Sequence, residues 1–401
     1  MPRSASAPIP LDALVIGGGI AGLWTLAMLR NSGRAAVLVE ADALGRGQTV
    51  AAQGIIHGGL KYALNGVVGA DARAIASMPS RWMAACESPV FPDPKLSKAA
   101  VQSHATWLWG SPSVRGRLGL LGARAGLQTR PERVEPTDQP EAIAPLQTAC
   151  FRVSEPVFDP RVVLKELSDT HRSSIVKVDG PEAIAFSSRG GRVSEATLIQ
   201  GEHCLCVAPE KVLFCAGKGN EGLRTRLGLP GDATQRRPLQ MVTVEGALPE
   251  LYGHCVDGHT TRLTITSTAQ DAAGNRTWQL GGALAERGVA RPSAELIDLA
   301  RQELAELLPH LDFSQATFGT YEVDRAEVAT PRRGRPEDIS IRADGDGCTL
   351  TCFPTKMALA PRLADAVLPL VPAVHPVEPL LEGLTPFARP SVAAFPWETK
   401  P

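Results

Sequence analysis

The first forty residues contain the pattern that most constrains how this chain can fold. An apolar run at 12–16 (DALVI) passes directly into glycines with G-x-G-x-x-G spacing, and an Ala/Leu-rich stretch at 20–29 follows. A second apolar run at 35–39 (AAVLV) ends at Glu40. Short apolar runs of this kind are typical of buried parallel strands, and the stretch between them has helical character. The segment is therefore predicted to be a strand–helix–strand unit of the Rossmann type.

Each glycine of the motif has a separate physical task. Gly17 permits the tight turn out of the strand, Gly19 lets backbone approach a pyrophosphate, and Gly22 lets the helix pack closely on the strand. The helix start directs N–H groups and the positive end of its dipole toward the phosphates. Glu40 stands 18 residues after Gly22, where its carboxylate can accept hydrogen bonds from ribose hydroxyls. The predicted nucleotide-binding positions in this unit are Gly17, Gly19, Ile20, Ala21, Gly22 and Glu40.

The stretch after the second strand distinguishes between two cofactors. It reads ADALGRGQ at 41–48 and TVAAQGIIHGGLKY at 49–62, which is richer in glycine than a simple NAD dehydrogenase requires. Such a loop suits a chain that passes close to a flavin. An NAD(P)-dependent flavoprotein needs a second fingerprint, and the glycines at 217–222 (GKGNEG) are not followed by an acid on a second strand. FAD is therefore the predicted cofactor.

Composition and charge exclude several other classes. The chain has 401 residues and a formal net charge of −1, so no nucleic-acid partner is expected. We find neither a secretory leader nor about 18 consecutive apolar residues, so no transmembrane segment is expected and the predicted location is cytoplasmic. The eight cysteines include no CxxC, and we predict no metal site. Cys204, Cys206 and Cys215 are expected to be small buried side chains.

The segment 56–62, IHGGLKY, resembles the IHGGLRY signature of FAD-dependent glycerol-3-phosphate dehydrogenases. These enzymes belong to the D-amino-acid oxidase/glycerol-3-phosphate dehydrogenase superfamily. The loop is also similar to that of L-2-hydroxyglutarate oxidases, and the glycine oxidase and sarcosine oxidase branch shares the layout. Five later segments resemble the family in the same order, so the resemblance covers about residues 12–370. They are FDPRVVLKEL at 158–167, KVLFCAG at 211–217, WQLGGA at 278–283, YEVDR at 321–325 and TLTCFPTKMALAP at 349–361.

The resemblance implies an α/β architecture in which a Rossmann-like FAD-binding domain is interleaved with an antiparallel-sheet α+β substrate domain. The FAD-binding domain would take 12–60, 150–232 and 322–370, and the substrate domain 61–149 and 233–321. Alternating Thr-, Val- and aromatic-rich segments predict the substrate-domain strands, and leucine spacing predicts a helix at 292–308. The strands are expected at 104–109, 241–245, 262–268 and 277–281. Proline-rich residues 371–401 are expected to form an extended or partly disordered tail.

Three departures from the family pattern argue against a phosphorylated substrate. Lys61 stands where glycerol-3-phosphate dehydrogenases have arginine, and a lysine does not reproduce bidentate arginine binding. The usual pair of small hydroxyl residues in the flavin loop is replaced by Thr49 and Val50. Within these 401 residues we also expect no counterpart of the extra C-terminal helical domain of the bacterial dehydrogenases.

The matching positions predict further contacts with FAD. The loop after the second strand contributes one group, the strand that ends in Ala-Gly a second, and the loop before the last helix a third. The predicted positions are Ala41, Gly47, Gln48, Thr49, Gly54, Ile55, Ala216, Gly217, Thr355, Lys356 and Met357. A helix beginning near Met357 would direct its N-terminus at the flavin edge that becomes negative on reduction.

Four side chains are candidates for catalysis. His57 can orient the substrate, act as a base, contact FAD or bond to it covalently, and it can equally be a hydrogen-bonded core histidine. Lys61 and Arg325 are candidate anchors for a carboxylate or phosphate. Lys356 can place a positive charge beside the flavin or a substrate anion, or lie in solvent. Trp107 and the other tryptophan of its strand can line the pocket or pack in the core.

We therefore predict an FAD-dependent oxidoreductase that moves hydride from a small, anionic molecule to flavin N5. The donor is an amine or amino acid (CH–NH) or an alcohol or hydroxy acid (CH–OH). The electron acceptor is oxygen, a quinone or a protein. The alternative is a catalytically silent FAD-binding or regulatory protein that keeps the fold without turnover.

Overall fold

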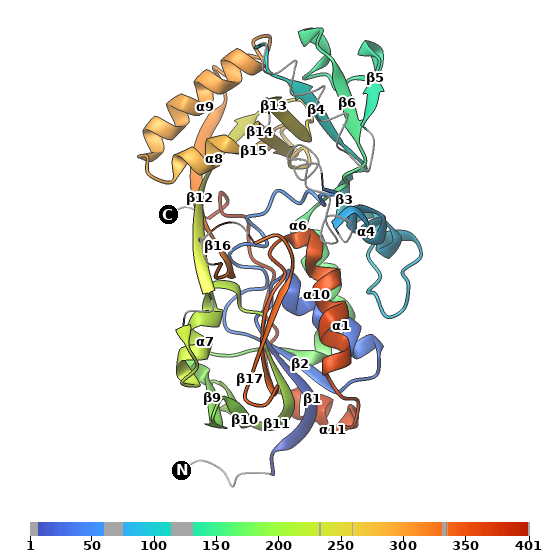
Figure 1. Ribbon diagram of the computed structural model, residues 1–401, viewed down its shortest axis with the longest axis vertical. Helices are drawn as coiled ribbons and strands as arrows, with labels where there is room; N and C mark the ends of the chain where they lie inside the picture. The colour runs from blue at the N-terminus through green and yellow to red at the C-terminus, as the bar shows by residue number, and fades with distance from the viewer. Residues whose placement is uncertain are drawn as a thin grey trace.

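A computed structural model describes residues 7–59, 75–113, 131–231, 234–258, 260–330, 334 and 336–399. Its described strands form two large sheets, one above the other along the long axis of the molecule (Figure 1). The chain passes several times between the two sheets. A short ladder of β3 (Val101–Ser103) and β7 (Val157–Phe158) lies between them.

The lower sheet contains the predicted Rossmann unit. Its main path runs β17-β18-β11-β1-β2-β8, with β10 on β11 and β9 on β10. The ladders that join β1 to β2 and β11, β2 to β8 and β11 to β18 are parallel. The strands are β1 (Ile9–Ile16), β2 (Ala36–Glu40), β8 (Ile175–Lys177), β9 (Ile184–Arg189), β10 (Arg192–Gln200), β11 (His203–Phe214), β17 (Ser340–Asp344) and β18 (Thr349–Phe353).

Helix α1 (Ile20–Asn31) packs on this sheet because it is apolar on nearly every side. Every residue from Ile20 to Leu29 is buried between the sheet and two helices, α6 (Pro160–Thr170) and α10 (Ala360–Val367). The ring centroids of Trp24 and Trp82 lie 4.7 Å apart, which joins α1 to α4 (Met78–Glu87). Two shorter helices in the lower half are α7 (Asn220–Arg226) and α11 (Glu378–Leu384).

The upper sheet has the order β16-β12-β15-β14-β13-β4-β6-β5. Helices α8 (Ala283–Gly288) and α9 (Ser293–Leu307) cover its apolar face, which confirms the predicted helix at 292–308. Trp109 is buried in this core and Trp107 packs against it, so the pair is structural. The strands are β4 (Thr106–Gly110), β5 (Glu132–Val134), β6 (Cys150–Val153), β12 (Thr234–Gly246), β13 (Gly253–Asp257), β14 (Thr260–Ser267), β15 (Arg276–Gly281) and β16 (Thr317–Val328).

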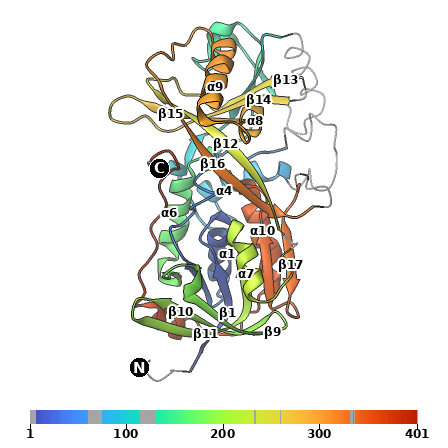
Figure 2. The ribbon, with the colours of Figure 1, turned by 90° about the vertical axis from the view of Figure 1, so that its left-hand side faces the viewer.

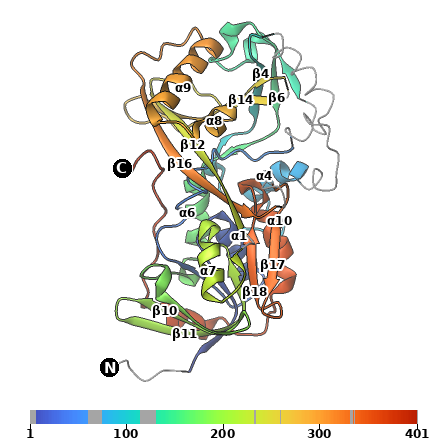
Figure 3. The ribbon, with the colours of Figure 1, turned by 60° about the vertical axis from the view of Figure 1, so that its left-hand side comes forward.

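Two long antiparallel strands, β12 and β16, connect the halves of the molecule (Figures 2 and 3). Their ladder runs without interruption from Thr234–Val328 to Glu245–Thr317. The boundary expected at 322 therefore falls inside β16, and the one expected at 150 falls at the start of β6, which pairs in the upper sheet. Because β16 extends below the upper sheet, its side chains border the space between the two halves.

Two expectations about exposure and order need correction. Cys204 is exposed and Cys206 half-buried, because successive strand side chains point to opposite faces and the buried residue here is Leu205 between them; Cys215 is buried as predicted. The proline-rich C-terminal segment contains α11 and buries Phe387 and Phe395, so in residues 371–399 it is a packed part of the molecule. Within the described part of the chain, no helix is both long and apolar enough to cross a membrane.

Candidate functional site

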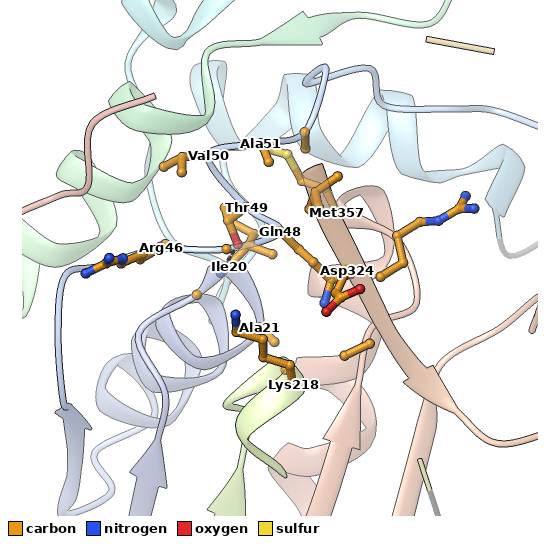
Figure 4. Close-up of a pocket in the computed structure, with 18 of the residues that line it drawn as sticks. Ile20, Ala21, Arg46, Gln48, Thr49, Val50, Ala51, Lys218, Asp324 and Met357 are labelled. Atoms are coloured by element: carbon orange, nitrogen blue, oxygen red, sulfur yellow. Dashed lines mark hydrogen bonds between the residues drawn. The ribbon is translucent and has the colours of Figure 1, made fainter. Parts of the chain in front are cut away.

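A cavity of about 1340 Å³ lies where the parallel strands of the lower sheet end and the upper sheet begins. This is the edge at which open α/β sheets bind ligands. The volume exceeds the 300–1,000 Å³ that is usual for small-molecule pockets. Figure 4 shows Ile20 and Ala21 at the start of α1 beneath Thr49, with Arg46 on one side and Asp324 of β16 on the other. The residues that line the cavity range from Ile16 to Thr399, so both halves of the chain contribute to its wall.

Two glycines of the motif leave no space for a side chain. Gly17 has φ +111°, and a Cβ there would lie 2.6 Å from the Cα of Ala216. A Cβ on Gly22 would lie 2.0 Å from the carbonyl oxygen of Gly17. The amide of Ile20 donates to Oγ1 of Thr49 at 3.2 Å, which ties the helix start to the following loop. Strand, turn and helix therefore meet at backbone-to-backbone distance, as a pyrophosphate cradle requires.

Glu40 ends β2 at the edge of this cradle. Its Oε2 accepts a hydrogen bond from the Gly18 amide at 2.7 Å, and its Oε1 accepts one from the Asp42 amide at 2.9 Å. Burial raises the pKa of Glu40, and the backbone amides partly oppose that rise. The carboxylate is thus fixed in position beside the glycine turn.

The loop after Glu40 follows the cavity wall. Gly54 has φ +70°, and a Cβ there would lie 1.9 Å from the carbonyl oxygen of Phe158. The Phe158 amide donates to the Gly54 oxygen at 2.9 Å, and Ile55 bridges to Val157. The short strand β7 therefore fixes the course of the loop just before it reaches His57.

On the far side, β18 leads into a loop and a helix start. Thr355 adopts φ +64°, and a 3-10 turn over Met357–Leu359 continues into α10, which confirms the predicted helix start near Met357. Nζ of Lys356 donates to the carbonyl oxygen of Glu337 at 3.4 Å. Lys356 lines the cavity, but this contact directs its ammonium group toward the loop before β17.

His57 lies on the cavity wall beside a buried carboxylate. Its Nδ1 is 3.2 Å from Oε2 of Glu155, and the amide of Gly58 donates to Oε1 of Glu155 at 2.7 Å. The side chain of Glu155 is 1% exposed, whereas that of His57 is 30% exposed toward the cavity. The ring of His254 lies 5.8 Å from that of His57, and its Nδ1 is 3.0 Å from Oγ1 of Thr264.

The charge of Glu155 depends on these neighbours. Burial by itself opposes ionisation, but the hydrogen bond from His57, the charges of His57 and His254, and the Gly58 amide together hold the pKa of Glu155 below its ordinary value. The ligand atoms of the three side chains lie within 4.8 Å of one another, a spacing that would also suit a metal ion. A histidine held by a buried carboxylate is the arrangement of a general base and the group that orients it.

A family model described as FAD dependent oxidoreductase matches residues 12–347. The chain belongs to the FAD-dependent oxidoreductase family. A Pseudomonas aeruginosa protein named "Probable FAD-dependent oxidoreductase" is 39% identical over 99% of each chain. The crystal structure of an FAD-dependent oxidoreductase from the same organism is similar, with a TM-score of 0.78 and 35% identity over 98% of this chain and 99% of that chain.

Two more distant structures share the fold of this FAD-dependent oxidoreductase. Glycine oxidase from Geobacillus kaustophilus has a TM-score of 0.63 and 13% identity over 90% of this chain and 94% of its own. L-alpha-glycerophosphate oxidase from Mycoplasma pneumoniae, with FAD bound, has a TM-score of 0.62 and 14% identity over the same shares. The predicted family and the predicted cofactor, FAD, are confirmed.

The structure brings most of the predicted FAD positions to one cavity. Only Gly22 among them does not line it, because this glycine serves the packing of α1 on the turn. The cradle, the fixed carboxylate of Glu40 and the size of the cavity all fit FAD. Lining positions that sequence reasoning missed include Gly18, Asp42, Gln53, Lys218 and Asp324.

Of the predicted anion anchors, Arg325 lies on the cavity wall formed by β16. Its Nε donates to the carbonyl oxygen of Arg237 at 3.3 Å. It lies four positions beyond Tyr321 on β16, or about 13 Å along the strand. Tyr321 itself donates to the Ala51 oxygen at 3.1 Å. Lys61 lies outside the described residues.

Glu155 and His254 were missed because no local motif marks them. They follow His57 by about 100 and 200 positions, and only the pairing of β4, β6 and β13 brings their segments to the cavity. The one available signal was a histidine within the apolar strand Gly253–Asp257.

Proposed function

We propose that this FAD-dependent oxidoreductase oxidises a small hydroxylated anion, such as a 2-hydroxy acid, at a CH–OH group. The observation that carries the proposal is the contact of His57 with the buried carboxylate of Glu155 on the cavity wall. Oxidation of an alcohol requires a group that removes the hydroxyl proton, whereas an amine reacts once its nitrogen is neutral. The anionic character of the substrate rests on the family resemblance and on Lys61, four positions after His57.

In this proposal the glycine turn and the start of α1 hold the pyrophosphate of FAD, and Glu40 binds the adenosine ribose. The fit is supported by the close backbone approach at Gly17 and by the hydrogen bonds that fix the Glu40 carboxylate. The loop 47–55 and the turn 355–357 border the remaining length of the cavity. When bound, FAD accepts a hydride, which is a hydrogen nucleus with two electrons.

His57 is assigned the role of base. Because Nδ1 of His57 faces Glu155, Nε2 is the nitrogen that can take the hydroxyl proton of the substrate. The carboxylate of Glu155 fixes this tautomer and stabilises the imidazolium that forms. The amide of Gly58 holds the same carboxylate from its other oxygen, so the base is oriented by a rigid neighbour.

His254 is assigned to substrate positioning. Thr264 fixes its Nδ1, and both residues line the same part of the cavity as His57. Two imidazoles 5.8 Å apart between ring centres can contact two polar groups of one small molecule. A 2-hydroxy acid carries such a pair, the hydroxyl and the carboxylate.

The proposal is tested by mixing the flavin-loaded protein anaerobically with 2-hydroxy acids, amino acids and glycerol phosphate, and by recording loss of the visible flavin band. We expect a hydroxy donor to bleach the flavin of the wild-type protein, and to bleach the flavin of His57→Asn only slowly. The exposed His310 lies outside the cavity, so His310→Asn is the matched control and should behave as wild type. Bleaching by amino acids alone would overturn the proposal, as would a His57→Asn protein that reacts at the wild-type rate. If no donor bleaches a fully loaded protein, the silent FAD-binding reading gains instead.

A further inference from the structure

We infer that the C-terminal segment 385–399, here called the strap, is an FAD-retaining element that forms one wall of the cofactor cavity. The strap lies beyond residues 12–347, which match the family model. Nevertheless Ala393, Ala394, Pro396 and Thr399 line the same cavity as the glycine turn. The C-terminus ends beside the junction of the two halves of the molecule (Figure 1). FAD would therefore be enclosed on this side by a segment that the cofactor motif does not include.

The first attachment of the strap is to the loop after β2. The Leu44 amide donates to the Ser391 oxygen at 2.8 Å, and the Ala393 amide donates to the Leu44 oxygen at 3.0 Å. Leu44 is 1% exposed, and its side chain is so close to Gly18 that a Cβ there would lie 2.4 Å from it. One residue thus contacts the strap on one side and the pyrophosphate cradle on the other.

The second attachment is to α6. The guanidinium group of Arg161 donates to both carboxylate oxygens of Glu398, at 2.8 and 2.6 Å. The same guanidinium lies 4.3 Å from the ring centre of Phe395. Phe395 is buried, and Glu398 also accepts a hydrogen bond from its amide at 3.0 Å. Both bonds come from one guanidinium nitrogen, Nη1, and each is a charge-assisted hydrogen bond.

The third attachment is to β16. The rings of Phe395 and Trp397 stack with centroids 4.6 Å apart and an interplanar angle of 9°. The ring centroid of Trp397 lies 5.6 Å from that of Tyr321. The Tyr321 hydroxyl donates to the carbonyl oxygen of Ala51 in the loop along the cavity. The strap is therefore joined to the lower half through Arg161 and to the strand β16 through Tyr321. It is joined to the loop along the cavity directly at Leu44 and indirectly through the hydrogen bond from Tyr321 to Ala51.

These attachments span the cavity wall, so release of FAD on this side requires that the strap detach. Its lining residues are small or lack long side chains, which lets backbone come close to a ligand. Loss of the strap should then accelerate FAD dissociation more than it changes the stability of the apoprotein. This consequence concerns cofactor retention and is independent of which substrate is oxidised.

The test measures the FAD dissociation rate, from the rise of free-FAD fluorescence after the loaded protein is diluted to a concentration at which rebinding is negligible. The variants are a chain that ends at Arg389, Trp397→Ala and Glu398→Gln. We expect about a 10-fold or greater rise in the rate for the shortened chain and about 3- to 10-fold for the point variants. Trp397→Phe should keep most of the stacking and restore slow release. The exposed Glu382 of α11 lies outside the cavity, so Glu382→Gln is the matched control.

Thermal unfolding of each apoprotein separates retention from folding. A wild-type dissociation rate in shortened chain and point variants alike would overturn the inference. If the shortened chain does not fold, Trp397→Ala and Trp397→Phe decide, because the two differ in ring contact with Tyr321. Equal, wild-type rates for that pair would contradict the strap, and faster release by Trp397→Ala alone would support it.

Discussion

The Nδ1 atom of His57 lies 3.2 Å from Oε2 of Glu155, although the two residues are 98 positions apart in the chain. One partner is buried and the other faces the cavity. If His57 is the base, His57→Asn should lower the rate of flavin reduction by about 10²- to 10⁴-fold while FAD content stays unchanged. Stopped-flow absorbance measures this rate. Loss of FAD together with activity would instead assign His57 to cofactor binding.

Acid titration of Glu155 should show in stability. Its pKa lies below the ordinary value of 4.5, so the folded protein keeps the carboxylate charged where the unfolded chain begins to protonate it. The stabilisation is therefore present above about pH 5 and is lost as the pH falls through the lower folded value. The difference in unfolding free energy between wild type and Glu155→Gln, measured by urea denaturation, should shrink as the pH falls below about 5. A difference that grows on acidification would show the opposite shift.

Glu40 should control FAD affinity. Removal of its carboxylate in Glu40→Ala is expected to weaken FAD binding by about 10- to 100-fold, since hydrogen bonds to a charged group are at stake. Because burial raises the pKa of Glu40, affinity should also begin to fall at a pH above the ordinary value of 4.5. Fluorescence titration of the apoprotein measures both effects. Glu141→Gln, at an exposed position outside the cavity, is the control.

Gly22→Ala and Gly222→Ala form a matched pair that measures how an added methyl group changes stability at each position. At Gly22 the added Cβ meets backbone oxygen at 2.0 Å, whereas at Gly222 in α7 nothing lies within 4 Å. Gly22→Ala should destabilise the protein by about 2 kcal/mol or more and reduce FAD content. Gly222→Ala should be neutral or slightly stabilising, because alanine restricts the unfolded chain. Thermal unfolding of both variants, with and without FAD, gives the comparison; equal effects would refute the close approach of α1 to the turn.

The histidine–glutamate cluster should respond to added metal but should not require it. If His57 acts as base beside Glu155 and His254 positions the substrate, dialysis against EDTA leaves the rate of flavin reduction unchanged. Added Zn²⁺ should inhibit, because it can bind ligand atoms that lie within 4.8 Å of one another. His254→Asn should relieve that inhibition. Loss of activity with EDTA, restored by a divalent cation, would assign the cluster to metal binding.

Most of the cofactor site could be predicted from one local sequence motif. Strand, glycine turn, helix and Glu40 are contiguous in sequence, so their geometry follows from steric and dipolar rules that act over a few residues. The partners of His57 and the contacts of Trp397 could not be predicted in this way. They depend on strands paired across the sheet and on a C-terminal segment that returns to Leu44, and neither pairing leaves a local pattern.

The expected domain boundary at 322 falls inside β16. The position 322 matched a family motif, but the ladder of β12 with β16 continues to Val328 and determines where the strand ends. The C-terminal prolines indicate an irregular segment. They do not indicate that its aromatic residues pack against the rest of the molecule. Composition describes a segment's backbone better than it describes what the segment packs against.

The most direct measurement is the anaerobic rate of flavin reduction by a 2-hydroxy acid and by the 2-amino acid with the same side chain, each with and without deuterium at C2. The CH–OH proposal predicts that only the hydroxy acid reduces the flavin, with a primary isotope effect in wild type and a much lower rate in His57→Asn. Reduction by the amino acid alone, or at equal rates in wild type and His57→Asn, would contradict it.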